Sequence, residues 1–269
     1  MYIGPECDKI AGGASTSACS ASVNIHVIFI ISVMMKPVVL LVLVMAAAMG
    51  LQAQESIPGT LPSEGAKGGS GSAFVIARLK YSGGGDWYND PSSEVNMLEY
   101  LRKHTGMNVR PSFEYVDLAT DNIFSYPLLF LTGHGNITFS DGEAKRLRAY
   151  LDRGGFLYID DDYGLDTAIR REMRKVFSGQ EFREIPFSHP IYNSFFNFPH
   201  GLPKIHEHDK KAPQGLGLFT NDNRLCVFYT FETNPSDGWA DPEAHNDPPE
   251  RRETSFKIGT NIIVYALTN

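Results

Sequence analysis

His134 is the first candidate for chemistry in this 269-residue chain, because it lies between Gly133 and Gly135 at the end of an apolar run. Glycine has no side chain, so a ligand can approach the backbone closely beside it. The imidazole could therefore bind a ligand or act as a general base. The alternative is a turn histidine whose ring forms a hydrogen bond with a neighbouring loop.

Asp160, Asp161 and Asp162 follow another apolar run. Adjacent carboxylates repel one another unless a cation or hydrogen-bond donors offset their charge. Asp160 and Asp162 are therefore candidate ligands of a divalent metal, together with His134. The alternative is that one or two of the aspartates cap a helix beginning near Leu165, while the others face water.

Aromatic residues lie close in sequence to these acids. Trp87 and Tyr88 follow Asp86, and Tyr163 follows the three aspartates. Aromatic rings beside carboxylates suit a carbohydrate or a peptide ligand, although large aromatics also pack as a lid over a core. Further aromatics that we expect near the same edge are Tyr81, Phe195, Phe196 and Phe198.

Four more histidines occur in the irregular stretch 186–213, where proline is frequent. His189 is a further candidate metal ligand. His206 and His208 form a His-x-His pair that could bind zinc on an extended backbone, but the spacing fixes no third ligand. The polar stretch 232–253 is long for a loop, and loops of that length are usually functional or disordered.

Conventional nucleophile and phosphate motifs are absent from the sequence. The chain has no Gly-x-Ser-x-Gly elbow, and Cys226 lies within an apolar run, which predicts a core residue. The glycines at 83–85 match neither a phosphate loop nor a dinucleotide fingerprint.

The composition is that of a water-soluble globular protein, with 42% hydrophobic and 20% charged residues. The chain has 31 acidic and 24 basic residues and a net charge of -7. It therefore lacks the excess of basic side chains that binding to a phosphate backbone requires, and we expect no nucleic-acid partner. Three cysteines are too few for a disulfide framework.

Residues 34–53 have the layout of a secretory signal peptide: Lys36, an apolar segment at 38–51, and Ala53 as the cleavage site. Residues 1–33 then precede the native start. This interpretation predicts a periplasmic or secreted protein. The alternative is a retained membrane anchor, and the membrane would be a partner only through such an uncleaved segment.

Residues 54–72 are rich in glycine, serine and proline and are typical of a linker, which leaves 73–269 as one domain. Within that domain strands and helices alternate, and Ser140 and Glu143 form a capping box. We expect strands at 74–79, 109–118, 126–132, 156–159 and 225–231, and helices at 91–104, from 140 onward, at 165–177 and at 256–267.

This alternation predicts an α/β fold: a three-layer, doubly wound and mostly parallel sheet. Ligands bind such sheets outside the carboxyl ends of the strands. The segments around Asp86, His134 and Asp160 each follow a strand, so we expect them to lie on one edge.

The domain resembles a bacterial family of unknown function, number 4159. The matching features are 131–135, the helix 140–150, the segment 154–162, the segment 188–192 and the helix 259–267. The resemblance implies a class I glutamine amidotransferase-like (flavodoxin-like) fold. That superfamily uses a cysteine at a strand-to-helix turn with a histidine partner. The comparable turn here presents His134, so the resemblance implies no amidotransferase activity.

We therefore expect an exported α/β domain that binds a ligand or partner at the edge formed by His134 and Asp160. An envelope protein, a carbohydrate or a peptide would fit. One alternative is a metal-assisted hydrolase using Asp160, Asp162 and His134, with His189 as a further candidate and a metal-bound water as the nucleophile. Another is a structural envelope component without a ligand.

Overall fold

The computed structural model describes residues 72–269. The expectations for residues 1–33, the signal peptide at 34–53 and nearly all of the linker at 54–72 lie outside this part of the chain. Within the described residues, no helix is both long enough and apolar enough to cross a membrane.

A seven-stranded sheet forms the centre of the domain, in the order β2-β1-β3-β4-β7-β6-β5. The first five strands in this order are parallel, whereas β6 and β5 are antiparallel to their neighbours. The strands are β1 (Ala77–Lys80), β2 (Glu114–Asp117), β3 (Leu128–Leu131), β4 (Phe156–Asp160), β5 (Arg183–Glu184), β6 (Gln214–Phe219) and β7 (Leu225–Phe231).

The parallel part of the sheet has the strand order of a doubly wound fold, with its topological switch point between β1 and β3. The chain leaves β1 toward one side of the sheet and leaves β3 toward the other. The loops after these two strands therefore diverge, and such a switch point is where ligands bind in open α/β sheets.

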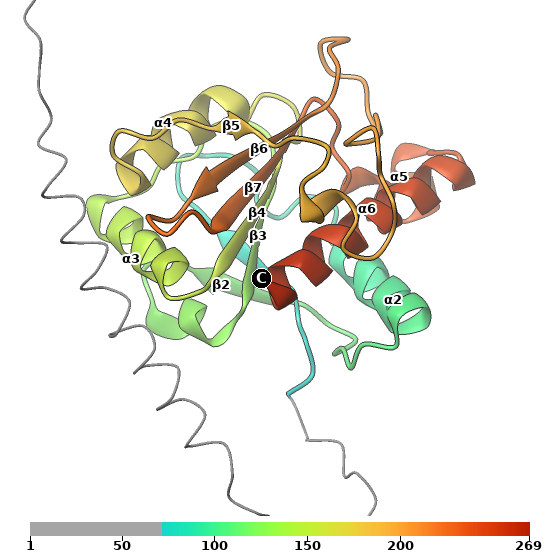
Figure 1. The fold of residues 1–269 in the computed structure, drawn as a ribbon, viewed down its shortest axis with the longest axis horizontal. Coiled ribbons are helices and arrows are strands. Elements are labelled where there is room, and N and C mark those ends of the chain that lie inside the picture. Colours follow the sequence, from blue (N-terminus) through green and yellow to red (C-terminus); the bar gives the residue numbers. More distant parts are fainter. Residues whose placement is uncertain (1–71) are drawn as a thin grey trace, which may run out of the picture. The chain divides into compact units, whose positions relative to one another are not determined.

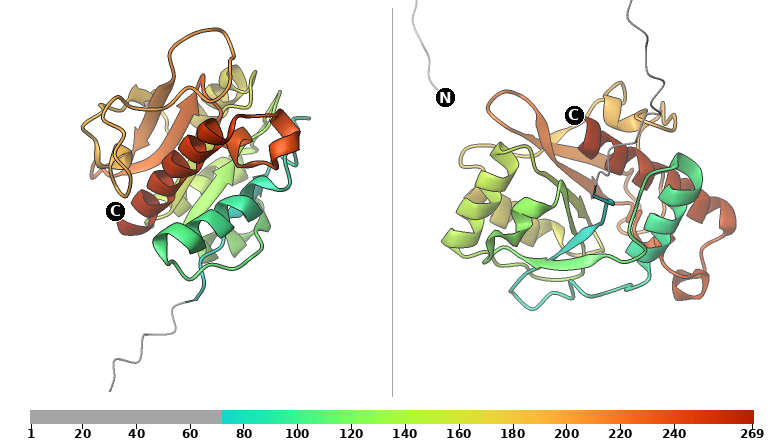
Figure 2. Two further views of the ribbon diagram at one scale, coloured as in Figure 1. Left: turned by 90° about the vertical axis from the view of Figure 1, so that its right-hand side faces the viewer. Right: turned by 90° about the horizontal axis from the view of Figure 1, so that it is seen from below.

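Helices cover both faces of the sheet, as Figures 1 and 2 show: α3 and α4 lie on one face, and α2 and α6 on the other. The predicted α/β class is thus confirmed, with a mostly parallel sheet. The helices are α2 (Ser93–Thr105), α3 (Asp141–Asp152), α4 (Asp166–Val176), α5 (Pro242–His245) and α6 (Pro249–Thr268). Short 3-10 helices occur at η1 (Asp121–Ser125), η2 (Pro190–Tyr192) and η3 (Asp237–Trp239).

Local sequence signals explain where the helices begin. The Ser140 hydroxyl accepts a hydrogen bond from the Glu143 N–H and the Glu143 carboxylate accepts one from the Ser140 N–H, which is the predicted capping box of α3. Helix α2 begins at Ser93 rather than at 91, because Asp90 has a left-handed backbone with φ of 42°. Helix α6 begins at Pro249, earlier than predicted, since proline suits the first helical turn.

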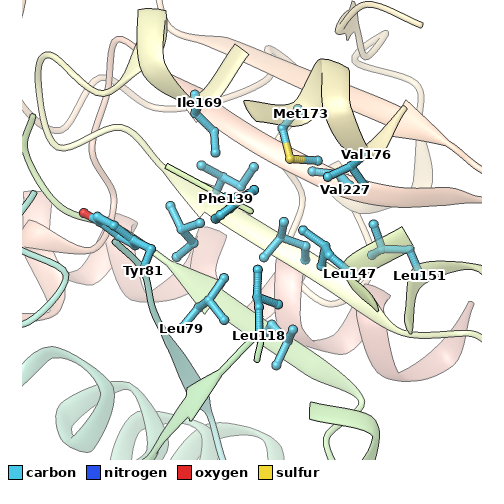
Figure 3. Packing of buried hydrophobic residues seen from close by; sticks show 14 of the residues in the cluster. Leu79, Tyr81, Leu118, Phe139, Leu147, Leu151, Ile169, Met173, Val176 and Val227 are labelled. Atoms are coloured by element: carbon cyan, nitrogen blue, oxygen red, sulfur yellow. The ribbon is translucent and has the colours of Figure 1, made fainter. Parts of the chain in front are cut away.

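Two apolar clusters hold the layers together. Figure 3 shows the cluster under α3 and α4, in which Leu147 and Ile169 from the helices meet Leu79 and Val227 from the sheet. The second cluster lies under α2 and α6 and includes Trp239, which is 1% exposed. Alternate residues of β3 belong to opposite clusters, as expected of a strand with both faces covered.

Strands β5 and β6 were not predicted. Strand β6 contains Gly215 and Gly217, which weaken the sequence signal for a strand. The structure explains them: a Cβ at Gly215 would overlap the Tyr192 hydroxyl, and one at Gly217 would lie 2.6 Å from Cδ1 of Ile185. The glycines allow side chains of the preceding segment to pack across the strand.

Candidate functional site

The loops that follow β1, β3, β4 and β7 meet at one end of the sheet, which we call the carboxyl rim. His134, after β3, connects the first three of them. Its Nδ1 lies 3.0 Å from a carboxylate oxygen of Asp86, and its Nε2 lies 3.1 Å from one of Asp162. The three segments that the sequence placed on one edge are therefore in direct contact.

The backbone conformation before His134 explains why residue 133 is a glycine. Gly133 has a φ of 131°, a conformation that L side chains rarely adopt, and a Cβ there would overlap the Tyr81 hydroxyl. That hydroxyl donates a hydrogen bond to the Thr132 carbonyl oxygen at 3.1 Å. The His134 N–H donates to Asp86, so both the ring and the backbone of His134 are fixed by the loop after β1.

A buried arginine positions the loop that carries Asp86. Arg78, on β1, is 1% exposed and forms an ion pair with Glu94 on α2, including a 2.9 Å bond from Nη2 to Oε2. Its remaining donors bind the carbonyl oxygens of Trp87 and Asn89. Because a planar guanidinium donates in fixed directions, it holds both the helix and the loop.

Asp162 is the acceptor at which the loops converge. In addition to His134, Asn234 donates to it from Nδ2 at 2.6 Å, and Asn89 donates to its other oxygen. Asn89 follows β1 and Asn234 follows β7, so four strand ends contribute to this one carboxylate. The Asp162 side chain is 5% exposed, and these donors replace the water that it loses.

The two carboxylates determine the charge of His134. The hydrogen bond to Asp162, assisted by that to Asp86, outweighs partial burial and raises the pKa of His134 to about 9. The ring is thus an imidazolium at neutral pH, with both nitrogens engaged. A general base needs a free nitrogen lone pair, so this arrangement suits binding rather than proton abstraction.

Asp160 and Asp161 do not face water, which corrects the sequence-based expectation. Asp160 is fully buried, and its oxygens accept hydrogen bonds from the Thr230 hydroxyl and from the Ser236 N–H. Burial raises its pKa to about 8. With both oxygens satisfied inside the protein, Asp160 is not available as the metal ligand that the sequence suggested.

Asp161 lies just before α4, and its Oδ1 accepts a hydrogen bond at 3.2 Å from the N–H of Leu165, the residue that precedes the helix. The residue is 2% exposed, and burial raises its pKa to about 7. Of the three aspartates, Asp160 therefore contacts the loop after β7, Asp161 contacts the residue before α4, and Asp162 contacts His134.

His189 lies elsewhere, which corrects its place among the candidate site residues. Its Nδ1 accepts from the Ile191 N–H, and its ring lies 5.3 Å from that of Tyr265. Tyr265 in turn contacts Phe156, the first residue of β4, so His189 lies at the end of that strand opposite Asp160. Burial lowers the pKa of His189.

The candidate aromatic residues lie in two regions, one at the carboxyl rim and one beside α6. Trp87 packs edge-on against Tyr88 and Tyr115, whereas the rings of Tyr88 and Tyr163 are 60% and 56% exposed. Phe195 and Phe196 do not belong to the rim, because their backbone N–H groups bind Asn261 on α6. Cys226 is fully buried, as predicted, and burial raises the pKa of its thiol to about 12.

A cavity of about 250 Å³ opens beside the loop after β4. Tyr163 donates from its hydroxyl to Asp209 at 3.3 Å, and its ring lies 5.3 Å from that of His208. The lining is rich in hydrogen-bond acceptors and includes Asp161, Tyr163, His208, Asp209, Lys211 and Glu232.

The structure also brings in residues that the sequence did not assign to the site. Asp237 and His245, from the stretch after β7, and His206, from the segment between β5 and β6, form a compact group beside Asp162. The sequence signals were the unusual length of the polar stretch 232–253 and the His-x-His pair. His208, the other member of that pair, instead faces Asp161 at 3.8 Å.

The fold and the site together define a doubly wound α/β domain with a polar, acid-rich rim at the carboxyl ends of its parallel strands. Residues 75–267 match the family described as Domain of unknown function (DUF4159), and the chain belongs to this family. No curated protein matches the chain.

Proposed function

We propose that the protein is an exported domain that binds a carbohydrate at the carboxyl rim, in the cavity beside Tyr163. The observation that supports this most directly is the composition of that cavity. The exposed side chains of Asp209 and Lys211 line it and can accept and donate hydrogen bonds, and the Tyr163 ring is exposed at its edge. Sugar hydroxyls donate to carboxylates, and the apolar face of a sugar ring packs on an aromatic ring.

The size of the cavity favours a small ligand or one unit of a longer chain. At about 250 Å³ it lies below the usual range for drug-sized ligands, which is roughly 300 to 1,000 Å³. A terminal or side-chain sugar residue fits this description. The neighbouring bridge from His134 to Asp162 fixes the loop on which Tyr163 lies.

Binding without amidotransferase chemistry is the function that we infer for this fold. The strand order is compatible with a class I glutamine amidotransferase-like fold, in which the turn after the third strand would carry the nucleophile. Here that turn carries His134, whose ring nitrogens both contact carboxylates. The thiol of Cys226 is buried in the core, and its raised pKa disfavours a reactive thiolate.

Export is the second part of the proposal, and it rests on the sequence of residues 34–53. An envelope or extracellular location would give the domain access to carbohydrate polymers. The residues that precede the domain would then serve to deliver and attach it, rather than to build the rim.

A calorimetric titration of the full chain with chito-, cello- and xylo-oligosaccharides tests this proposal, with oligo-lysine and oligo-alanine peptides as the rival ligand class. We expect one carbohydrate series to bind. Tyr163→Ala should weaken that binding roughly 2- to 12-fold, the effect of losing one aromatic contact. Tyr88→Ala removes an equally exposed tyrosine that does not line the cavity, and should leave the affinity unchanged.

Two results would contradict the proposal. One is that peptides bind and no oligosaccharide does. The other is that Tyr163→Ala and Tyr88→Ala have the same effect on carbohydrate affinity, since the cavity beside Tyr163 would then not be the binding site.

A further inference from the structure

Two histidines and an aspartate form a group on the carboxyl rim that the carbohydrate proposal does not use. His206, Asp237 and His245, which we call the His206 cluster, each offer one ligand atom, and these atoms all lie within 4.8 Å of one another. They come from two segments that are far apart in sequence: His206 precedes β6, whereas Asp237 begins η3 and His245 ends α5. Asp237 belongs to a second such group with Asp90 and Asp162, which places the cluster directly beside the His134 bridge.

The orientation of the two rings is the informative feature. In both histidines Nδ1 faces the same oxygen of Asp237, at 2.5 Å for His206 and 3.8 Å for His245. In both, Nε2 faces another carboxylate: Asp247 at 3.3 Å for His206, and Asp90 at 3.0 Å for His245. Two nitrogens and one oxygen thus converge, and an acid lies behind each ring.

We propose that the His206 cluster binds a divalent transition-metal ion of the zinc class. A histidine that ligates a metal typically donates its other N–H to a carboxylate or carbonyl, which fixes the tautomer and the ring orientation. Asp90 fills this outer position for His245, at hydrogen-bond distance, whereas Asp247 lies 3.3 Å from Nε2 of His206 without forming a hydrogen bond. The cluster therefore has three convergent ligand atoms, and one of its two rings is oriented by an acid.

An unsatisfied atom provides an independent observation. The Asp237 side chain is 3% exposed, and its Oδ1 has no hydrogen-bond partner among the described residues. Leaving a buried carboxylate oxygen unpaired is costly, because the group has lost its water without replacement. The two ring nitrogens face the other oxygen, Oδ2, so a cation between them would satisfy Oδ1 by binding both oxygens of Asp237, and it would offset the charge that Asp90 and Asp162 add nearby.

The ligand types select the kind of metal. Two imidazoles with one carboxylate favour zinc and its neighbours among the transition metals, whereas magnesium and calcium prefer an all-oxygen environment. With metal–nitrogen bonds of roughly 2.0–2.1 Å, tetrahedral ligands lie about 3.3 Å apart. The separations of 2.5 and 3.8 Å from Asp237 lie on either side of that value, so small side-chain rotations would suffice.

The segment that carries Asp237 is anchored to the rest of the fold. The indole N–H of Trp239 donates to the Ser255 carbonyl oxygen on α6 at 3.0 Å, and the Ser93 hydroxyl on α2 donates to the Ser236 carbonyl oxygen at 3.1 Å. A rigid supporting shell keeps metal ligands in place. Three protein ligands would leave one coordination position open, as in catalytic zinc sites. The metal site stands without the carbohydrate proposal, which concerns the separate cavity beside Tyr163.

Zinc binding to the metal-stripped full chain, measured by calorimetry and elemental analysis, tests the proposal. We expect the wild type to bind one more equivalent of zinc than a variant combining His206→Ala and His245→Ala, and magnesium not to compete. Because only the difference between the two zinc stoichiometries is used, any zinc bound elsewhere on the chain cancels. His200→Ala is the matched control, because His200 is exposed and outside the cluster, and it should keep the full stoichiometry.

Asp237→Asn separates ligation from folding. The amide keeps the size of the carboxylate and an acceptor oxygen for His206, but it loses the charge that a metal ligand requires. We expect zinc affinity at this site to fall at least about 100-fold, beyond the loss typical of outer-shell changes, with unchanged circular dichroism. Bound cobalt should give visible d–d absorption in the wild type and in Tyr163→Ala, whether or not carbohydrate binds.

The proposal is wrong if the wild type and the double-alanine variant bind the same number of zinc ions. It is equally wrong if folded Asp237→Asn binds zinc as tightly as the wild type. Should the double variant fail to fold, the Asp237→Asn comparison decides the question by itself.

Discussion

His134 shows how two neighbours determine what a side chain can do. The histidine has the residue type of a general base and lies at a ligand-binding edge, yet Asp86 and Asp162 contact both of its nitrogens. The pKa of about 9 makes it a cation that ties three loops together. In the structure the ring therefore bridges the loops that follow β1, β3 and β4.

The stability contributed by His134 should depend on pH in a defined direction. Its pKa is raised from 6.5 to about 9 in the folded protein, so its contribution is complete below about pH 6.5 and is lost as the pH rises through about 9. Because the side chain is 52% exposed, we discount the effect for solvent screening to about 1 kcal/mol. His134→Gln should thus destabilise the protein in urea near pH 6 but hardly near pH 10. A difference that stays constant across this range would contradict the assigned contacts.

Asp160 should tolerate loss of its charge but not loss of its hydrogen bonds. With a pKa of about 8, the buried carboxyl is mostly neutral at pH 7, and asparagine can replace it with partners for both Thr230 and Ser236. We expect Asp160→Asn to change the free energy of unfolding by less than about 1 kcal/mol, and Asp160→Ala to cost about 2–3 kcal/mol through the unpaired Ser236 N–H. Equal losses in both variants, measured by chemical denaturation, would show that the charge matters.

The sequence predicts part of this site. The meeting of His134 with the aspartates follows from parallel strands, because their carboxyl ends share one edge. All three aspartates are buried, and which of them contacts Thr230 depends on the strand register that pairs Asp160 with Thr230, which the sequence does not reveal. The His206 cluster joins a loop before β6 to the short helices η3 and α5, which are too short to show a periodic pattern, so their meeting is determined by tertiary packing.

At the scale of elements, helix α6 supports the rim through Trp239. A Cβ at Gly259 would lie 2.5 Å from Trp239 Cζ2 and 2.9 Å from the Met97 sulfur, so this helical glycine makes room for the indole. The segment between β7 and α6 continues directly from Trp239 to His245. Close packing of Trp239 on α6 is therefore linked to the positions of Asp237 and His245.

Two matched glycine substitutions test this link. Gly259→Ala should destabilise the protein by about 1–2 kcal/mol, because overpacking costs roughly 1–3 kcal/mol and the gain in helix propensity returns up to about 1 kcal/mol. Gly142→Ala in α3 meets only the Ser140 hydroxyl, at 3.9 Å, and should stabilise the protein by up to about 1 kcal/mol. Urea unfolding measures both. Stabilisation by Gly259→Ala would mean that α6 and Trp239 are not in contact.

The elements with strong local signals are those that the sequence predicts best. The capping box located the start of α3, and continuous apolar runs located β3 and β4. Strand β6 was missed because its glycines are needed to make room for the side chains of Tyr192 and Ile185, which are distant in sequence. Short β5 pairs only with β6 and has no apolar pattern of its own.

At the scale of the whole molecule, the export proposal makes a separate prediction. Expressed with its own leader in a bacterial host, the protein should be recovered outside the cytoplasm with Gln54 as its first residue, because signal peptidase cleaves after small residues such as Ala53. N-terminal sequencing and mass spectrometry of the exported fraction measure this directly. An uncleaved chain in the membrane fraction would favour the anchor interpretation instead.

The central claim for the whole molecule is that the strand ends bring His134 between Asp86 and Asp162. Side-chain ¹H–¹⁵N spectra of the histidines across a pH titration test this most directly, with His134→Gln assigning the signal. We predict that His134 is an imidazolium at pH 7.5, protonated on both nitrogens, and that it titrates near pH 9. A neutral ring that titrates near pH 6.5 would show that the loops do not meet as described.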